Sequence, residues 1–132
     1  MHYPAWLDRS LYPYRHNYYH TGLGRLHYVD HGEGPPVIFL HGNPTWSFMY
    51  RRMIHRFSAQ FRCIAPDYLG FGLSDKPVDW NYRPCLHAET IRQFIESLGV
   101  NRIFLVVHDW GGPIGLSYAL RKIEKIAGLI IL

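Results

Sequence analysis

The sequence predicts an α/β fold: a mostly parallel sheet that begins with an antiparallel hairpin and carries helices on both faces. Two observations lead to this prediction. Short apolar runs bounded by turn residues are typical of strands buried on both faces. Between these runs, apolar residues recur every three or four positions, as they do in amphipathic helices. Alternation of such strands and helices favours a parallel sheet.

Length and composition restrict the class of protein. The 132 residues suffice for one domain with a sizeable core. Hydrophobic residues make up 48% and charged residues 18% of the chain, which excludes a disordered protein. The net charge of +4 comes from scattered basic residues, so nucleic-acid binding is disfavoured. Because no Cys–His cluster has metal-ligand spacing, no metal and no cofactor is expected.

The cysteines and the N-terminus predict a location. Cys63 and Cys85 are too few for a disulfide framework and indicate free thiols in a reducing compartment. Residues 1–6 lack a basic segment followed by an apolar run, and no stretch approaches the roughly 18 apolar residues of a membrane span. We therefore expect a cytoplasmic protein with no targeting segment and no membrane contact.

The first third of the chain predicts an arm and a hairpin. Residues 1–16 are aromatic and interrupted by prolines, which favours an arm lying over the domain. Residues 17–20 and 24–31 are expected as two strands joined at a glycine-containing turn.

In the rest of the chain, predicted strands alternate with predicted helices, as expected for a parallel sheet. Buried strands are expected at 37–40, 63–65, 103–107 and 126–132. Helices are expected at 46–57, 86–98 and 111–121. Thr45 or Ser47 is the expected cap of the first helix, Gly99 ends the second, and Pro113 fits the first turn of the third.

The clearest functional signal is Val-His-Asp-Trp-Gly-Gly at 107–112. A buried strand, a sharp turn and a helix together have the form of a nucleophile elbow, with Asp109 at the nucleophile position. Gly111 would allow the tight turn and Gly112 the close packing of the helix. A helix N-cap is the alternative interpretation of Asp109. His108 points to the opposite face of the strand and is interpreted as structural.

A second strand-to-helix segment is Phe-Leu-His-Gly-Asn-Pro-Thr-Trp at 39–46. Since the carboxyl ends of parallel strands converge, residues 41–45 and Asp109 should share one rim of the sheet. There the backbone N–H groups of Asn43 and Trp110 can form an oxyanion hole. An ordinary turn is the alternative for this segment.

A third segment, residues 67–75, contains the pair Gly70 and Gly72. Nucleotide binding is rejected, because no third glycine and no helix follow at the required spacing. We expect a turn-rich loop that shapes the rim.

Together these segments resemble the α/β-hydrolase superfamily and, within it, the haloalkane dehalogenases. Residues 41–47 and 108–112 look like the two signature segments of that family, and 70–77 matches its intervening loop. The resemblance covers about Tyr18 to Leu132. Parts of both signatures are shared with epoxide hydrolases, so an epoxide hydrolase relative is an alternative. Those enzymes usually carry an aromatic residue at the position of Asn43.

The resemblance implies the roles of three residues. Asp109 would be the nucleophile that displaces halide from a small halogenated alkane and forms an alkyl ester, which water then hydrolyses. An aspartate is ionised at neutral pH, and a helix N-terminus favours its negative charge. The Asn43 amide and the Trp110 indole N–H would bind the halide. Core packing is the alternative for Trp110.

Two parts of this machinery are missing from the sequence. The superfamily order is nucleophile, acid, histidine. No histidine follows Asp109, and the one remaining acid candidate, Glu124, precedes the last strand. The cap domain would also come later. We therefore expect residues 1–132 to form a single partial domain, truncated after about the sixth strand, without base, acid or cap. A non-catalytic fragment that only folds or binds a partner is the remaining alternative.

Overall fold

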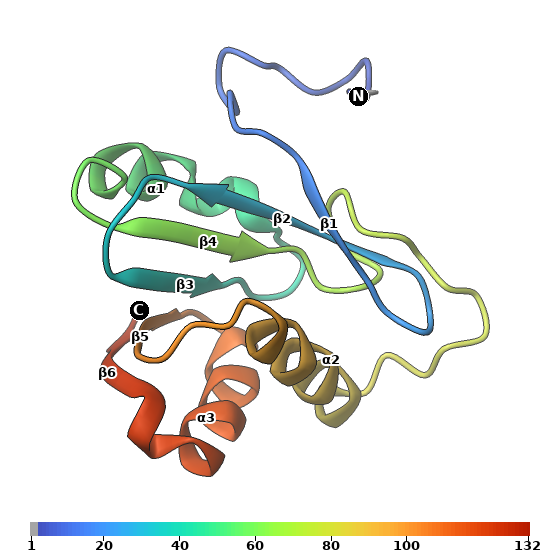
Figure 1. Cartoon of the computed structure of the whole chain (residues 1–132). Coiled ribbons are helices and arrows are strands. Elements are labelled where there is room, and N and C mark those ends of the chain that lie inside the picture. The colour runs from blue at the N-terminus through green and yellow to red at the C-terminus, as the bar shows by residue number, and fades with distance from the viewer. Residues whose placement is uncertain (1–2) are drawn as a thin grey trace.

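The computed structural model describes residues 3–132 as a six-stranded mixed sheet covered by helices (Figure 1). The strand order is β1-β2-β4-β3-β5-β6. The bounds are Asn17–His20 for β1, Arg25–His31 for β2, Pro36–Leu40 for β3, Arg62–Pro66 for β4, Ile103–Val107 for β5 and Ile126–Ile131 for β6. β2 pairs antiparallel with β1 and β4, and the pairs from β4 to β6 are parallel. The predicted fold class and the initial hairpin are confirmed.

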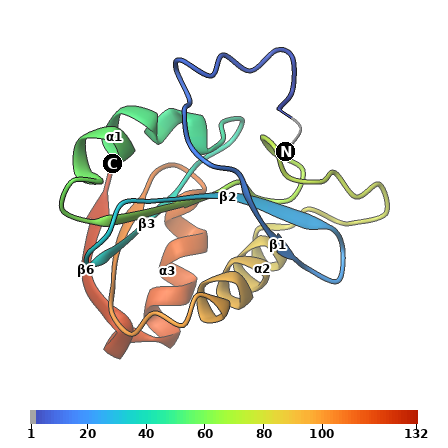
Figure 2. The same ribbon diagram turned by 45° about the horizontal axis from the view of Figure 1, so that its top comes forward.

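The helices lie on both faces of the sheet, as predicted. A 3₁₀ turn η1 (Ser47–Tyr50) leads into α1 (Arg51–Phe57) on one face, and α2 (Pro84–Ser97) and α3 (Gly111–Arg121) cover the other. A second 3₁₀ turn, η2 (Ile123–Lys125), precedes β6. Figure 2 shows the N-terminal segment, residues 3–16, on the same side of the sheet as α1, whereas residues 1–2 of the predicted arm lie outside the described residues. No helix among the described residues is both long and apolar enough to cross a membrane.

The core consists of two apolar clusters separated by the sheet. Side chains alternate along β3, because successive residues of a strand point to opposite faces. Ile38 and Leu40 pack with α2 and α3, whereas Val37 and Phe39 pack with α1. The N-terminal segment adds three buried side chains to the α1 cluster, namely Leu7, Tyr12 and Tyr14.

The predicted cap of the first helix is wrong. Neither Thr45 nor Ser47 caps it through its side chain. Instead the Ser47 N–H donates to the Asp67 carboxylate at 2.7 Å, from the end of a neighbouring strand. A tertiary partner therefore replaces the local cap that the sequence suggests.

The prediction of a buried last strand is also wrong. Leu129, Ile130 and Ile131 of β6 are 39%, 41% and 66% exposed. The cause is the position of β6 at the edge of the sheet, where it pairs with β5 alone. Next to it, on the α1 side of the sheet, lies an apolar hollow of about 200 Å³, lined by residues that include Phe61, Phe104 and Ile130.

Candidate active site

Asp109 stands in the sharp turn between β5 and α3. Its φ of +52° lies in the left-handed region, which few residues other than glycine adopt. Main-chain hydrogen bonds fix the turn, from Gly111 N–H to the His108 carbonyl at 2.9 Å and from Gly112 N–H to the Asp109 carbonyl at 2.8 Å. The N-cap of α3 is Trp110 rather than Asp109. The strand–turn–helix arrangement predicted for this segment is therefore present, and it holds the Asp109 side chain at the carboxyl end of the sheet.

Two glycines let α3 begin against the sheet. A Cβ on Gly111 would lie 2.2 Å from the Leu40 carbonyl oxygen, and one on Gly115 would lie 2.6 Å from Val107 Cγ1. A Cβ on Gly112 would have nothing within 4 Å. The packing role predicted for Gly112 is therefore wrong, because Gly112 does not face the sheet and Gly111 and Gly115 do.

The turn after β3 brings Asn43 to the same rim. The Asn43 N–H donates to Asp109 Oδ2 at 3.1 Å, although the two residues are 66 positions apart. The Trp110 N–H donates to the same oxygen at 2.7 Å. A Cβ on Gly42 would lie 2.4 Å from Asp109 Cβ, so only glycine permits this approach. The structure thus brings together the three residues predicted for the site.

The two main-chain donors control the charge of Asp109. Hydrogen bonds from the Asn43 N–H and then the Trp110 N–H hold the pKa of the Asp109 carboxyl below its ordinary value of 3.8. The carboxylate is therefore ionised at neutral pH. Its other oxygen, Oδ1, accepts no hydrogen bond within residues 3–132.

A cavity of about 220 Å³ opens beside these residues. Most of its lining is apolar or aromatic, and the lining residues are Gly42, Asn43, Tyr68, Phe71, Tyr82, Pro84, His87, Trp110 and Ile114. Tyr68 and Phe71 come from the loop after β4, so this loop shapes the rim as predicted. Such a cavity next to an ionised carboxylate suits a small, mainly apolar substrate.

His87 is a cavity residue that the sequence analysis missed. It lies on α2, is 6% exposed and stands edge-on to the Trp80 ring, with the ring centroids 4.8 Å apart. Burial, with a smaller contribution from His41, lowers the pKa of His87 to about 4, so its imidazole is neutral at pH 7. Its one signal in the sequence is a histidine on the apolar face of the predicted helix.

The other histidines near the site are engaged elsewhere. His41 Nε2 accepts the Tyr68 N–H at 3.1 Å, and its Nδ1 bonds the Gly42 carbonyl at 2.8 Å. The His108 ring lies 3.3 Å from the Leu132 carbonyl oxygen. Glu124 precedes β6, which runs parallel to β5, so it lies at the amino ends of the strands, whereas Asp109 lies at their carboxyl ends. Residues 3–132 contain no group of three His, Cys, Asp or Glu side chains arranged to hold a metal ion.

Comparison with known proteins identifies the family. Residues 35–132, which run from the start of β3 through β6, match the family described as the alpha/beta hydrolase fold. The chain belongs to the α/β hydrolase fold family. This α/β hydrolase chain is 44% identical to Haloalkane dehalogenase 2 of Mycobacterium tuberculosis over 124 residues, which are 94% of the chain and 43% of that protein. It is 43% identical to the cis-3-alkyl-4-alkyloxetan-2-one decarboxylase of Shewanella oneidensis over 126 residues, covering 93% of the chain and 40% of that protein.

Solved structures of other α/β hydrolases agree. The haloalkane dehalogenase DatA of Agrobacterium tumefaciens superposes with a TM-score of 0.84 at 30% identity, covering 89% of this chain and 40% of that one. A mutant epoxide hydrolase of Vigna radiata superposes with a TM-score of 0.81 at 31% identity, covering 89% of this chain and 38% of that one. The chain spans less than half the length of each of these proteins. The resemblance to haloalkane dehalogenases predicted from the motifs is confirmed.

Proposed function

We propose that this α/β hydrolase site performs the nucleophilic chemistry of a haloalkane dehalogenase, with Asp109 as the nucleophile of an elbow. One observation supports this most directly. Two main-chain N–H groups hold Asp109 Oδ2 at 2.7 and 3.1 Å, while Oδ1 stays free beside a mostly apolar cavity. An oxygen that is already ionised suits attack on a saturated carbon, and the mostly apolar lining of the neighbouring cavity suits an alkyl substrate.

The first step exchanges one bond for another. An electron pair of Oδ1 forms a C–O bond with the substrate carbon, and the C–halogen bond breaks with its pair leaving on the halide. The side-chain amide of Asn43 and the indole N–H of Trp110 bind the departing halide. Both residues line the cavity, and both are neutral donors, so they stabilise the anion as it forms.

The second step uses the donors that already hold Oδ2. When water attacks the ester carbon, negative charge develops on Oδ2, where the Asn43 and Trp110 N–H groups form an oxyanion hole. This step needs a base to take a proton from water. No histidine follows Asp109, and both ring nitrogens of His41 are in use. We therefore expect the 132-residue chain alone to stop at the alkyl ester.

Two other electrophiles remain candidates. Asn43 favours a haloalkane over an epoxide, because epoxide hydrolases usually have an aromatic residue there. The 43% identity to the Shewanella decarboxylase favours a second candidate, an oxetan-2-one. Attack of Oδ1 on the saturated ring carbon would break the ring C–O bond and leave its electron pair on the released carboxylate. A strained lactone and a haloalkane thus offer the same kind of carbon to Asp109.

The test is the formation of an adduct on Asp109. The chain is incubated with 1-bromobutane, an alkyl epoxide or a dialkyl oxetan-2-one, and adducts are located by peptide mass mapping. Mapping is needed because Cys85 is an exposed free thiol, so Cys85→Ser serves as the background for all variants. We expect one butyl group per chain and no more, on Asp109, and the absence of any adduct on Asp109 would contradict the proposal. Steady bromide release over many turnovers would contradict the expected stop at the ester and indicate a base such as His87.

We also propose a cytoplasmic location. Cys63 is buried and Cys85 exposed, and both are free thiols, which reducing compartments maintain. Cell fractionation that finds the protein in an oxidising compartment would contradict this proposal.

A further inference from the structure

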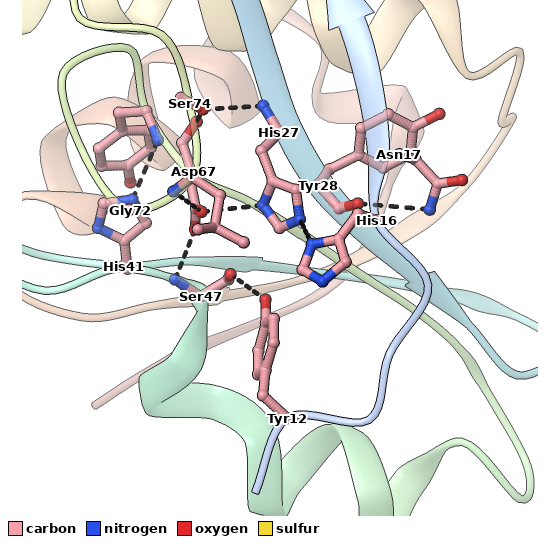
Figure 3. Close-up of polar contacts among 12 residues, drawn as sticks. Tyr12, His16, Asn17, His27, Tyr28, His41, Ser47, Asp67, Gly72 and Ser74 are labelled. Atoms are coloured by element: carbon pink, nitrogen blue, oxygen red, sulfur yellow. Dashed lines mark hydrogen bonds and ion pairs between the residues drawn. The ribbon is translucent and has the colours of Figure 1, made fainter. Parts of the chain in front are cut away.

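A buried polar network surrounds the Asp67 carboxylate (Figure 3). Asp67 follows β4 and is fully buried. Its Oδ1 accepts the Ser47 N–H at 2.7 Å, and its Oδ2 accepts the Leu73 N–H at 2.9 Å and pairs with His27 Nδ1 at 2.9 Å. A buried carboxylate is costly unless such donors satisfy it.

These donors keep Asp67 ionised. Burial works to raise the pKa of the Asp67 carboxyl, but the hydrogen bond from His27 and the other partners lower it below the ordinary value. The other ring nitrogen of His27, Nε2, is hydrogen-bonded to His16 Nδ1, 2.8 Å away. Burial lowers the pKa of His16 to about 4, so that ring is neutral at pH 7. The network thus reaches the N-terminal segment.

Ser47 is held from two sides. Its N–H is bound by Asp67, and its Oγ lies 2.5 Å from the Tyr12 hydroxyl oxygen. Ser47 begins η1 directly after the turn that carries Asn43. Gly72 closes the other side, where a Cβ would lie 2.3 Å from Asp67 Oδ2 and 2.8 Å from Trp46 Cβ. The glycine lets the loop after β4 pack against both the carboxylate and the turn.

We propose that Asp67 is a positioning residue of the site: through Ser47 it fixes the turn that aims the Asn43 N–H at Asp109 Oδ2. Tyr12 and His16 connect the N-terminal segment to the same hydrogen-bond network. The predicted effect of Asp67 on the reaction of Asp109 rests on the function proposed above. Its predicted effect on the position of the Asn43 N–H does not. A purely structural Asp67 would stabilise its own loop and leave the ionisation of Asp109 unchanged.

The first test compares Asp67→Asn with Asp75→Asn. An asparagine cannot accept at both of its side-chain positions, so the Ser47 or the Leu73 N–H loses its partner. Asp75 lies in the same loop, but its carboxylate binds Arg25 at an exposed site without contacting Ser47. The pKa of the Asp109 carboxyl is followed by NMR titration of carbon-labelled chain, and the butylation rate of Asp109 by mass mapping.

We expect the pKa of Asp109 to rise toward its ordinary value in Asp67→Asn, because the Asn43 N–H is the main group that lowers it. Butylation should slow by on the order of tenfold, as expected when a reacting group is misplaced. Asp75→Asn should leave both quantities unchanged.

A second variant keeps the test decisive if Asp67→Asn does not fold. Ser47→Pro removes the one N–H that Oδ1 accepts, together with the hydroxyl that contacts Tyr12, and leaves Asp67, His27 and Leu73 intact. The extended backbone of Trp46 suits a following proline, and proline suits the first position of a helix. An unchanged pKa of Asp109 in folded Ser47→Pro, which removes the contact itself, would overturn the positioning role. If the pKa of Asp109 changes in the variants but the wild-type chain forms no adduct, the positioning role of Asp67 is supported and the dehalogenase proposal is contradicted.

Discussion

The Asn43 N–H lies 3.1 Å from Asp109 Oδ2, joining the turn after β3 to the turn after β5. Those two strands are neighbours in the sheet, with Leu40 paired to Val107 at their carboxyl ends. Their contact leaves Asp109 with one carboxylate oxygen held by main-chain N–H groups and the other without a hydrogen bond within residues 3–132.

Gly42→Ala should displace the nucleophile. The added Cβ would lie 2.4 Å from Asp109 Cβ and 2.8 Å from Oδ2, so the carboxylate must move away from the Asn43 N–H. We expect butylation of Asp109 to fall by roughly 10²-fold, the usual effect of a misplacement of about 1 Å. Mass mapping of the adduct over time measures this.

The matched control is Gly112→Ala, since a Cβ there meets nothing within 4 Å. It should leave butylation unchanged and raise the free energy of unfolding by about 0.5–1 kcal/mol, because alanine loses less backbone entropy in a helix. Equal butylation rates in the two alanine variants would show that Gly42 does not control the position of Asp109.

Asp109→Asn should abolish butylation and keep the fold. The amide is neutral and a far weaker nucleophile. Asparagine tolerates the left-handed φ of +52° at least as well as aspartate does. We therefore expect no butyl group at position 109 and a thermal melting temperature close to wild type, measured by circular dichroism. Adduct formation at the wild-type rate would assign the chemistry to another residue.

Trp110→Phe should weaken halide binding. The change keeps an aromatic ring and removes the indole N–H from the cavity. Bromide titration should quench less tryptophan fluorescence in this variant than in wild type. Trp6→Phe is the control, because Trp6 is 66% exposed and lies in the N-terminal segment, away from the cavity lining. Quenching that disappears in Trp6→Phe but survives in Trp110→Phe would contradict the halide-binding role.

Buried neutral histidines should make the fold sensitive to acid. The pKa of His87 is about 4 in the folded chain against an ordinary 6.5, so the unfolded chain binds more protons between these values. The free energy of unfolding should therefore fall as the pH drops from about 6.5 to 4. Urea titrations should show a shallower pH dependence for His87→Phe, whereas His55→Phe, at an exposed position, should match wild type. Equal slopes in wild type and His87→Phe would contradict the lowered pKa.

Local patterns predicted most of the fold. The helix at 111–121 is found at the predicted bounds, because its apolar spacing, an early proline and a strand just before it all agree. The shared rim of Asn43 and Asp109 was also predictable, since parallel strands place their carboxyl ends together.

Tertiary partners account for what the sequence did not show. Ser47 binds Asp67, 20 positions away, and no local pattern pairs them. The sequence alone does not show whether Gly111 or Gly112 packs against the sheet. The structure shows that Gly111 does, because a Cβ there would collide with the Leu40 carbonyl oxygen at the end of β3. The exposure of β6 likewise depends on which elements pack against it, and the apolar residues of the strand do not reveal this.

The strand order bears on how the candidate site survives partial opening of the fold. The loops that form it follow β4, β3 and β5, three consecutive strands of the sheet, with β3 in the middle. Fraying of β1 or of β6 at the two edges breaks no main-chain pairing among these three. Hydrogen exchange should therefore be slowest for β3, and the contact between Asn43 and Asp109 should persist through edge fluctuations, to be lost only when the centre of the sheet unfolds.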